Sequence, residues 1–461
     1  MAERIFMASN IRDMTSGKPA KLLIEFALPL MVGNILQQLY TMVDTIVVGR
    51  GIGVQALAAL GAVDWLNWMI LNIIIGFAQG FSILVSQFFG AGDQKNLRKA
   101  VSMSALLGVI LAVVTTVASE LAAVSLLHLL NTPEDIIGMA TQYIRVSFAG
   151  IIVVMAYNVL SSTLRAMGDS KTPLHAMAIA AAINVVLDVL FVIVLGMGIA
   201  SAAVATLIAQ IFSCVYCFIA IKKIPALKLT KSDWEPEYRI ITKLLKLGTP
   251  MAFQNVTIAI GGLIVQSVVN GYGFLFVAGF TATNKLYGLL ELAATSFGFS
   301  MATFAGQNLG AGKVHRIKEG MRSGIFISFL TSAVMSAIVI LFGRQIAALF
   351  VSGDPEQVAA VVSIAYQYLF IMGSMLFILY LLYLYRSAIQ GMGDTIIPML
   401  SGVAELIMRI AAVVLLPRFM GQQGVFYAEI AAWIGADLIL ITAYYIKINR
   451  LSKRFHQPSG E

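Results

Sequence analysis

The chain has 461 residues, of which 59% are hydrophobic and only 12% are charged. Soluble globular proteins carry about 25% charged residues, and no soluble domain has enough interior to hide this much apolar surface. The composition therefore excludes a soluble protein. The net charge of +8 could suggest a nucleic acid or another anionic partner, but the positions of the cations point to a different origin.

Twelve long apolar runs follow one another along the chain, separated by short polar segments. A membrane-spanning helix needs roughly 20 mainly apolar residues, whereas a barrel strand needs about 10. We therefore expect an all-α polytopic membrane protein. Its predicted spans are residues 22–48, 56–88, 98–120, 138–165, 173–196, 200–222, 246–270, 276–309, 319–345, 362–390, 397–416 and 424–447.

The segments that flank the spans indicate the orientation. The first 21 residues lack the apolar core of a signal peptide, and we expect a short amphipathic helix or a disordered tail there. With this end inside, 25 of the 31 Lys and Arg face the cytoplasm, counting Arg386 and seven in 222–246. Cytoplasmic segments are typically rich in cations. We expect a cell (plasma or inner) membrane protein with both termini cytoplasmic, so the basic balance reports topology.

The chain contains two copies of one plan. The segment "QFFGAGDQKNLRKAV" (87–101) matches "QNLGAGKVHRIKEGM" (307–321), and "RAMGDSKTP" (165–173) matches "QGMGDTIIP" (390–398). Each copy holds six spans, so both enter from the same side and form a parallel repeat, an arrangement typical of transporters. We expect a cytoplasmic segment (1–21), a first lobe (22–221), a basic linker (222–246), a second lobe (247–448) and a cytoplasmic tail (449–461).

Acidic side chains within the first copy are the candidate ion site. Asp44 and Asp188 each lie fifteen residues after a proline that begins their span, about 22 Å along the helix. Asn184 precedes Asp188 by one turn, and Thr206 enters from the next span at a similar depth. Such carboxylates can hold a proton, or the oxygens can cage Na⁺; the alternative is a static network that fixes helix packing.

Further polar residues at membrane depth are candidate substrate contacts. In the second copy Arg409 and Val413 replace Asn184 and Asp188, and Glu405 lies one turn before Arg409, so the two either pair locally or bind substrate. The candidate substrate contacts are Gln37, Tyr40, Gln254, Lys285, Glu291, Glu405 and Arg409.

Other motifs favour structural roles. Cys214 and Cys217 lie in an apolar helix without nearby His, so packing is the favoured interpretation. The segment "GAGK" (310–313) lacks the remainder of a phosphate-binding loop, and the four His cannot form a metal site or a catalytic triad. No ATP-binding or catalytic motif is found, so we expect no enzyme activity and no cofactor besides the coupling ion.

The sequence resembles the multidrug and toxic compound extrusion (MATE) family of bacterial type. The similarity rests on "ALPLMVGNILQQLYTMVDTIVVGR", "RAMGDSKTP", "NVVLDVLFVIVLGMGIASAAVATLIAQ" and "FAGQNLGAGK", and covers residues 22–448. It implies two six-helix lobes in a V and efflux of drugs in exchange for H⁺ or Na⁺. It also implies ion coupling at Asp44, Asn184, Asp188 and Thr206.

We therefore expect a monomeric antiporter that exports small cationic or amphipathic molecules by alternating access of its lobes. The alternative in the same architecture is a flippase for a lipid-linked saccharide or another lipid. Such a flippase would need more buried cations than Arg145, Lys285 and Arg409 supply. A membrane enzyme and a passive channel are less favoured.

Overall fold

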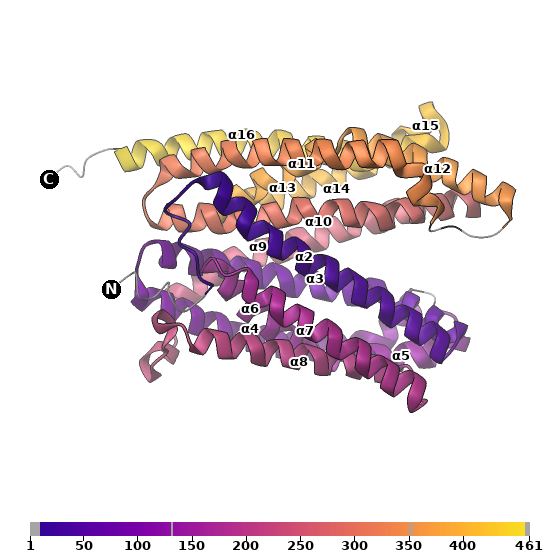
Figure 1. The fold of residues 1–461 in the computed structure, drawn as a ribbon, viewed down its shortest axis with the longest axis horizontal. Coiled ribbons are helices and arrows are strands. Elements are labelled where there is room, and N and C mark those ends of the chain that lie inside the picture. The colour runs from indigo at the N-terminus through magenta and orange to yellow at the C-terminus, as the bar shows by residue number, and fades with distance from the viewer. Residues whose placement is uncertain (1–9, 131, 350, 352–353, 457–461) are drawn as a thin grey trace. The chain divides into compact units, whose positions relative to one another are not determined.

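The computed structural model describes residues 10–130, 132–349, 351 and 354–456, and all regular structure within them is helical (Figure 1). The first repeat contains α2 (Pro19–Gly51), α3 (Val54–Gly90), α4 (Gln94–Leu129), α5 (Glu134–Ala149), α6 (Ile151–Ala166), α7 (Lys171–Asp188), the π-helical turn η1 (Val189–Val194) and α8 (Ala200–Lys222).

The second repeat follows two short 3₁₀ turns, η2 (Pro225–Leu227) and η3 (Lys231–Trp234). It contains α9 (Tyr238–Asn270), α10 (Phe274–Gly310), α11 (Val314–Ala348), α12 (Pro355–Ser374), α13 (Leu376–Gly391), α14 (Ile396–Leu415), α15 (Pro417–Met420), η4 (Gly421–Tyr427) and α16 (Ala428–His456).

The number of membrane spans follows from helix lengths. Ten stretches of the described residues are long and apolar enough to cross a membrane, and the pair α5–α6, bent by 44°, adds an eleventh. The stretch 396–455 has 60 residues, and a straight helix of that length would measure about 90 Å against a hydrocarbon core of about 30 Å. It holds α14 and α16, which pack against each other. The predicted all-α fold with twelve transmembrane helices is therefore confirmed.

The internal repeat is visible in the backbone as well as in the sequence. Gly92 and Gly312, 220 residues apart, end α3 and α10 with φ of 69° and 71°. Only glycine adopts this left-handed conformation without a steric penalty. Three more glycine pairs with positive φ recur at separations of 220 or 225 residues, namely Gly53 and Gly273, Gly168 and Gly393, and Gly196 and Gly421. The same turns therefore close corresponding helices in both copies.

The chain forms two compact units whose division lies inside helices. The first unit comprises residues 10–13 and 28–252 of the described chain, and the second comprises 14–27 and 253–456. The starts of α2 and α9 thus each belong to the other repeat's unit. Each division lies within three residues of a proline inside the helix, Pro29 or Pro250, where a backbone hydrogen bond is missing.

The segment expected to be a linker, 222–246, is ordered and lies against α4. Asp233 is buried; it accepts hydrogen bonds from Thr230 and pairs with Arg98 at 3.3 Å. Burial raises the pKa of the Asp233 carboxyl, but the hydrogen bonds and the Arg98 charge outweigh burial, and the pKa is lowered. The carboxylate therefore holds this segment at neutral pH and loses its contribution as the pH falls through the lowered pKa. Helix α9 begins at Tyr238, within the expected linker.

Residues 10–18 are irregular and bound to the protein, which corrects the expectation of an amphipathic helix or a disordered tail for this part; residues 1–9 lie outside the described chain. The Met14 amide donates to Gln307 Oε1 at 2.9 Å, and Asn308 Nδ2 donates to the Met14 carbonyl at 3.0 Å. Lys313 and Arg316 donate to the carbonyls of Thr15 and Gly17. The connection between α10 and α11 thus holds residues 14–17.

We expect Asn308→Ala to lower the free energy of unfolding by about 1–3 kcal/mol, because it leaves buried polar groups without partners. It should also release residues 10–18, so that limited trypsin digestion cleaves faster after Arg12 or Lys18. Thermal melting in detergent and the rate of that cleavage measure both effects. Lys95→Ala, at an exposed position in α4, is the control. An unchanged cleavage rate in Asn308→Ala would contradict the anchoring role.

Candidate ion and substrate site

Three predicted ion-site residues meet between α7 and α8. Asn184 and Asp188 lie one turn apart on α7 and are 1% and 0% exposed. Asn184 Nδ2 donates to Thr206 Oγ1 on α8 at 3.2 Å, and Thr206 donates to the carbonyl of Ala202 at 3.2 Å. The single hydroxyl proton of Thr206 is used in its own helix. Its oxygen and the Asn184 oxygen therefore face the site only as acceptors.

Asp44 of α2 completes the cluster. Its carboxylate is buried and interacts electrostatically with Asp188. Asp44 Oδ1, Asn184 Oδ1 and both carboxylate oxygens of Asp188 are buried without a hydrogen-bond partner. A buried acceptor without a partner costs about 1–3 kcal/mol, and a charged one costs more. An all-oxygen set of this kind fits a proton or a hard cation such as Na⁺.

The backbone around Asp188 is irregular. Helix α7 ends at Asp188 and continues directly as the π-helical turn η1. Such turns are rare and are frequent at functional sites. The corresponding helix α14 is regular from Ile396 to Leu415, so this irregularity distinguishes the first repeat.

Two residues that sequence reasoning missed lie around the acids. Tyr143 of α5 interacts electrostatically with Asp44, Asp64 and Asp188. Asp64 of α3 also interacts with Asp44. Asp64 could have been found, because it interrupts the apolar run "LGAVDWLNW" (60–68). The predicted contacts Gln37 and Tyr40 precede Asp44 on α2, and Tyr40 interacts with both Gln37 and Asp44.

A cavity of about 170 Å³ adjoins the cluster at Thr206. Its polar lining comes from Asn67, Tyr143, Ser147 and Gln210, and Gln210 Oε1 is buried without a partner. The remaining wall is apolar, with residues such as Ile74, Phe148, Ile151 and Leu207. An apolar cavity with a few oriented polar groups is typical of small-molecule sites.

The charged residues of the second repeat pair differently from the prediction. Glu405 pairs with Arg386 of α13, and Arg409 pairs with Glu429 of α16 at 2.7 Å. The local pair between Glu405 and Arg409 is therefore wrong, because partners on neighbouring helices take both side chains. Arg386, counted from sequence among the cytoplasmic cations, is buried at 6% exposure.

The remaining candidates of the second unit are dispersed. Glu291 accepts a 2.5 Å hydrogen bond from Tyr383, and Gln254 accepts one from Gln390 at 3.2 Å. Lys285 is exposed. Asp437 of α16, which sequence reasoning missed inside "AAWIGADLILI" (431–441), is 5% exposed and its Oδ1 has no partner.

Two six-helix repeats with polar sites buried in apolar helices define a polytopic membrane transporter. The sequence model of the MatE family matches residues 29–190 and 250–415. The chain belongs to this family, whose members are transporters and not enzymes.

Known relatives agree with this assignment. The chain is 33% identical over 349 residues to the probable multidrug resistance protein YpnP of Bacillus subtilis, covering 75% of this chain and 78% of that protein. It is 24% identical over 348 residues to the FAD transporter of Shewanella oneidensis, covering 74% and 76%. The fold matches a multidrug resistance MATE family transporter in an outward-facing conformation, with a TM-score of 0.88 at 24% identity over 95% of this chain and 98% of that one.

We expect Glu405→Gln to lower the free energy of unfolding by about 3–5 kcal/mol, because it leaves the Arg386 charge buried without its partner. Exchanging Glu405 and Arg386 should restore much of the stability, whereas exchanging Glu405 and Arg409 should not. Thermal unfolding in detergent compares the variants, with Glu134→Gln at an exposed position as the control. Rescue by the Arg409 exchange alone would contradict the observed pairing.

Proposed function

We propose that the protein is a secondary antiporter that exports small cationic or amphipathic molecules in exchange for H⁺ or Na⁺. The observation that carries the proposal is the set of buried acceptor oxygens without partners on Asp44, Asn184 and Asp188. In a site that is only structural, we would expect these oxygens to be paired, as Glu405 is with Arg386.

The charge state of the two acids provides the coupling. Two neighbouring carboxylates in a dry site repel each other and lack solvation, so the empty, ionised site is costly. A proton or Na⁺ removes that cost and favours one arrangement of the surrounding helices. When the ion leaves, the exposed negative charge favours a cationic substrate in the same unit. Ion and substrate then alternate, and their fluxes are coupled.

The substrate site combines the cavity beside Thr206 with the polar face of α2. The apolar wall suits an aromatic or aliphatic body, and Gln37, Tyr40 and Gln210 supply hydrogen bonds. In the second unit, Gln254, Lys285 and Glu291 remain candidate contacts, while the buried pairs give Glu405 and Arg409 structural roles. The Shewanella relative is named for an anionic dinucleotide, so anionic substrates are the second candidate class; a lipid flippase is the alternative in the same fold.

We expect Asp44→Asn and Asp188→Asn to fold and insert but to lose gradient-driven export by about tenfold or more. Each variant mimics the protonated acid and cannot release a proton. The double variant should be little worse than either single, because the acids act as a unit. Flux in sealed vesicles under separately imposed proton and sodium gradients tests this, with Asp135→Asn as an exposed control.

The coupling ion is separated by Thr206→Val in the same vesicles. If Na⁺ is the ion, loss of the hydroxyl ligand raises the half-saturating Na⁺ concentration; if H⁺ is the ion, proton-driven flux stays near wild type. Full coupled transport in Asp44→Asn and Asp188→Asn, with only stability changed, would contradict the proposal. A panel of organic cations, organic anions and a lipid-linked saccharide distinguishes the substrate classes.

The uneven distribution of cations supports a cytoplasmic location for both termini. In a chain without its two native cysteines, we expect Ser232→Cys in η3 to react with a membrane-impermeant maleimide only from the cytoplasmic side. Glu134→Cys, at the start of α5, should react only from outside. Both positions are exposed, so accessibility is set by the side of the membrane. Labelling of Ser232→Cys on intact cells would reverse the orientation.

A further inference from the structure

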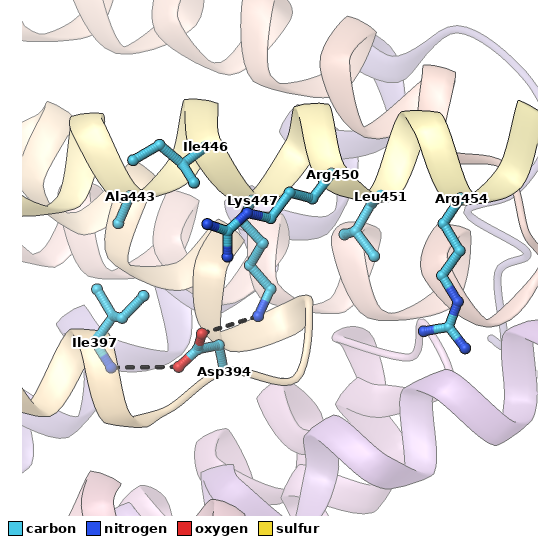
Figure 2. A pocket seen from close by; sticks show the side chains of 8 residues that line it. All are labelled: Asp394, Ile397, Ala443, Ile446, Lys447, Arg450, Leu451 and Arg454. Atoms are coloured by element: carbon cyan, nitrogen blue, oxygen red, sulfur yellow. Dashed lines mark hydrogen bonds and ion pairs between the residues drawn. The ribbon is translucent and has the colours of Figure 1, made fainter.

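A basic cavity of about 420 Å³ lies between the start of α14 and the last turns of α16 (Figure 2). Lys447, Arg450 and Arg454 project from one face of α16, and Asp394 projects from the connection before α14. The rest of the wall is apolar and is formed by Ile397, Ala443, Ile446 and Leu451. All these residues belong to the second unit, and none of them lies in the candidate ion site.

The charges of the cavity do not cancel. Asp394 Oδ2 pairs with Lys447 Nζ at 3.0 Å, and its Oδ1 accepts a hydrogen bond from the Ile397 amide at 3.3 Å. Within the described residues, Arg450 and Arg454 have no carboxylate within 4.0 Å. Both are exposed. The cavity therefore presents two guanidinium groups, which bind phosphate with parallel hydrogen bonds.

The part of α16 that carries these arginines is an addition to the repeated plan. In the first repeat the corresponding helix α8 ends at Lys222, 225 residues before Lys447, whereas α16 continues to His456. This extension is held in place. The Phe455 ring lies 3.5 Å from where a side chain on Gly312 would begin. The repeated fold does not need the extension, yet the chain orders it.

Apolar surface continues outward from the cavity. Ile396, Leu400 and Ile446 are 58%, 50% and 49% exposed. In a membrane-spanning bundle such side chains face lipid tails. A ligand in this cavity would thus meet cations at one end and lipid-facing side chains at the other.

Orientation signals and the helix dipole also place cations at such a helix end. Neither explanation requires the cations to line a cavity. Lys453 shows the difference, because it lies in the same turn and is exposed but does not line the cavity.

We propose that this cavity binds the phosphate head group of an anionic phospholipid. Arg450 and Arg454 contact the phosphate, and Ile397 and Ile446 contact the first part of an acyl chain. Basic pockets between transmembrane helices commonly bind such head groups.

The test uses the purified full chain in a neutral detergent, with phosphatidylglycerol added in steps and binding followed by native mass spectrometry. We expect Arg450→Gln/Arg454→Gln to weaken phosphatidylglycerol binding roughly 30-fold, since each cation near a membrane surface contributes about a tenfold or slightly smaller factor. Lys243→Gln/Lys453→Gln removes the same number of exposed cations away from the cavity and should leave binding near wild type. Phosphatidylcholine should bind weakly to all three proteins.

Equal losses in the two double variants would overturn the proposal, because general surface charge would then explain binding. Competition by millimolar inorganic phosphate as effective as that by the lipid would also overturn it and assign a free-phosphate site. If the double arginine variant unfolds, as judged by melting without added lipid, Arg454→Gln alone provides the same comparison against Lys453→Gln. Here too, equal binding by both proteins would overturn the proposal.

Discussion

The cost of burying a charge away from water governs how the two halves of this protein differ. In the second unit Glu405 and Arg409 each find an opposite charge on a neighbouring helix. In the first unit the oxygens of Asp44, Asn184 and Asp188 are left without donors. The same low dielectric makes the first arrangement rigid and the second unstable until a cation arrives.

The two halves share a frame that does not determine their chemistry. Glycines with positive φ close corresponding helices at constant separations, so the backbone repeats although most side chains do not. Within that frame Asn184 is replaced by Arg409 and Asp188 by Val413. Helix α7 gains a π-helical turn after Asp188, which α14 lacks. A duplicated bundle could thus keep its turns while one copy specialised in ion binding and the other in stable pairing.

Membership of the MatE family limits the function without fixing the substrate. One relative carries a multidrug resistance name and another the name of an FAD transporter. The difference between such substrates must lie in the lining of the cavity and in the charges near it. In this chain the cavity beside Thr206 is mainly apolar with amide and hydroxyl groups, and the nearest charges are acidic. That combination is the physical basis for proposing cationic or amphipathic substrates.

The sequence by itself determined the properties that depend on one helix at a time. Apolar run lengths gave the spans, the offsets gave the repeat, and the 3.6-residue period placed Asn184 on the same face as Asp188. Depth counting also brought Thr206 to the right level, because rise per residue is constant.

Only the tertiary structure decided which helices face each other, since rotation and tilt are set by the packing of many side chains together. Glu405 therefore chose Arg386 over Arg409, the neighbour one turn away. Residues 14–17 became part of the second unit through backbone hydrogen bonds that leave no sequence pattern. The end of α16, which reads as an ordinary basic tail, became one wall of a cavity because α14 begins beside it.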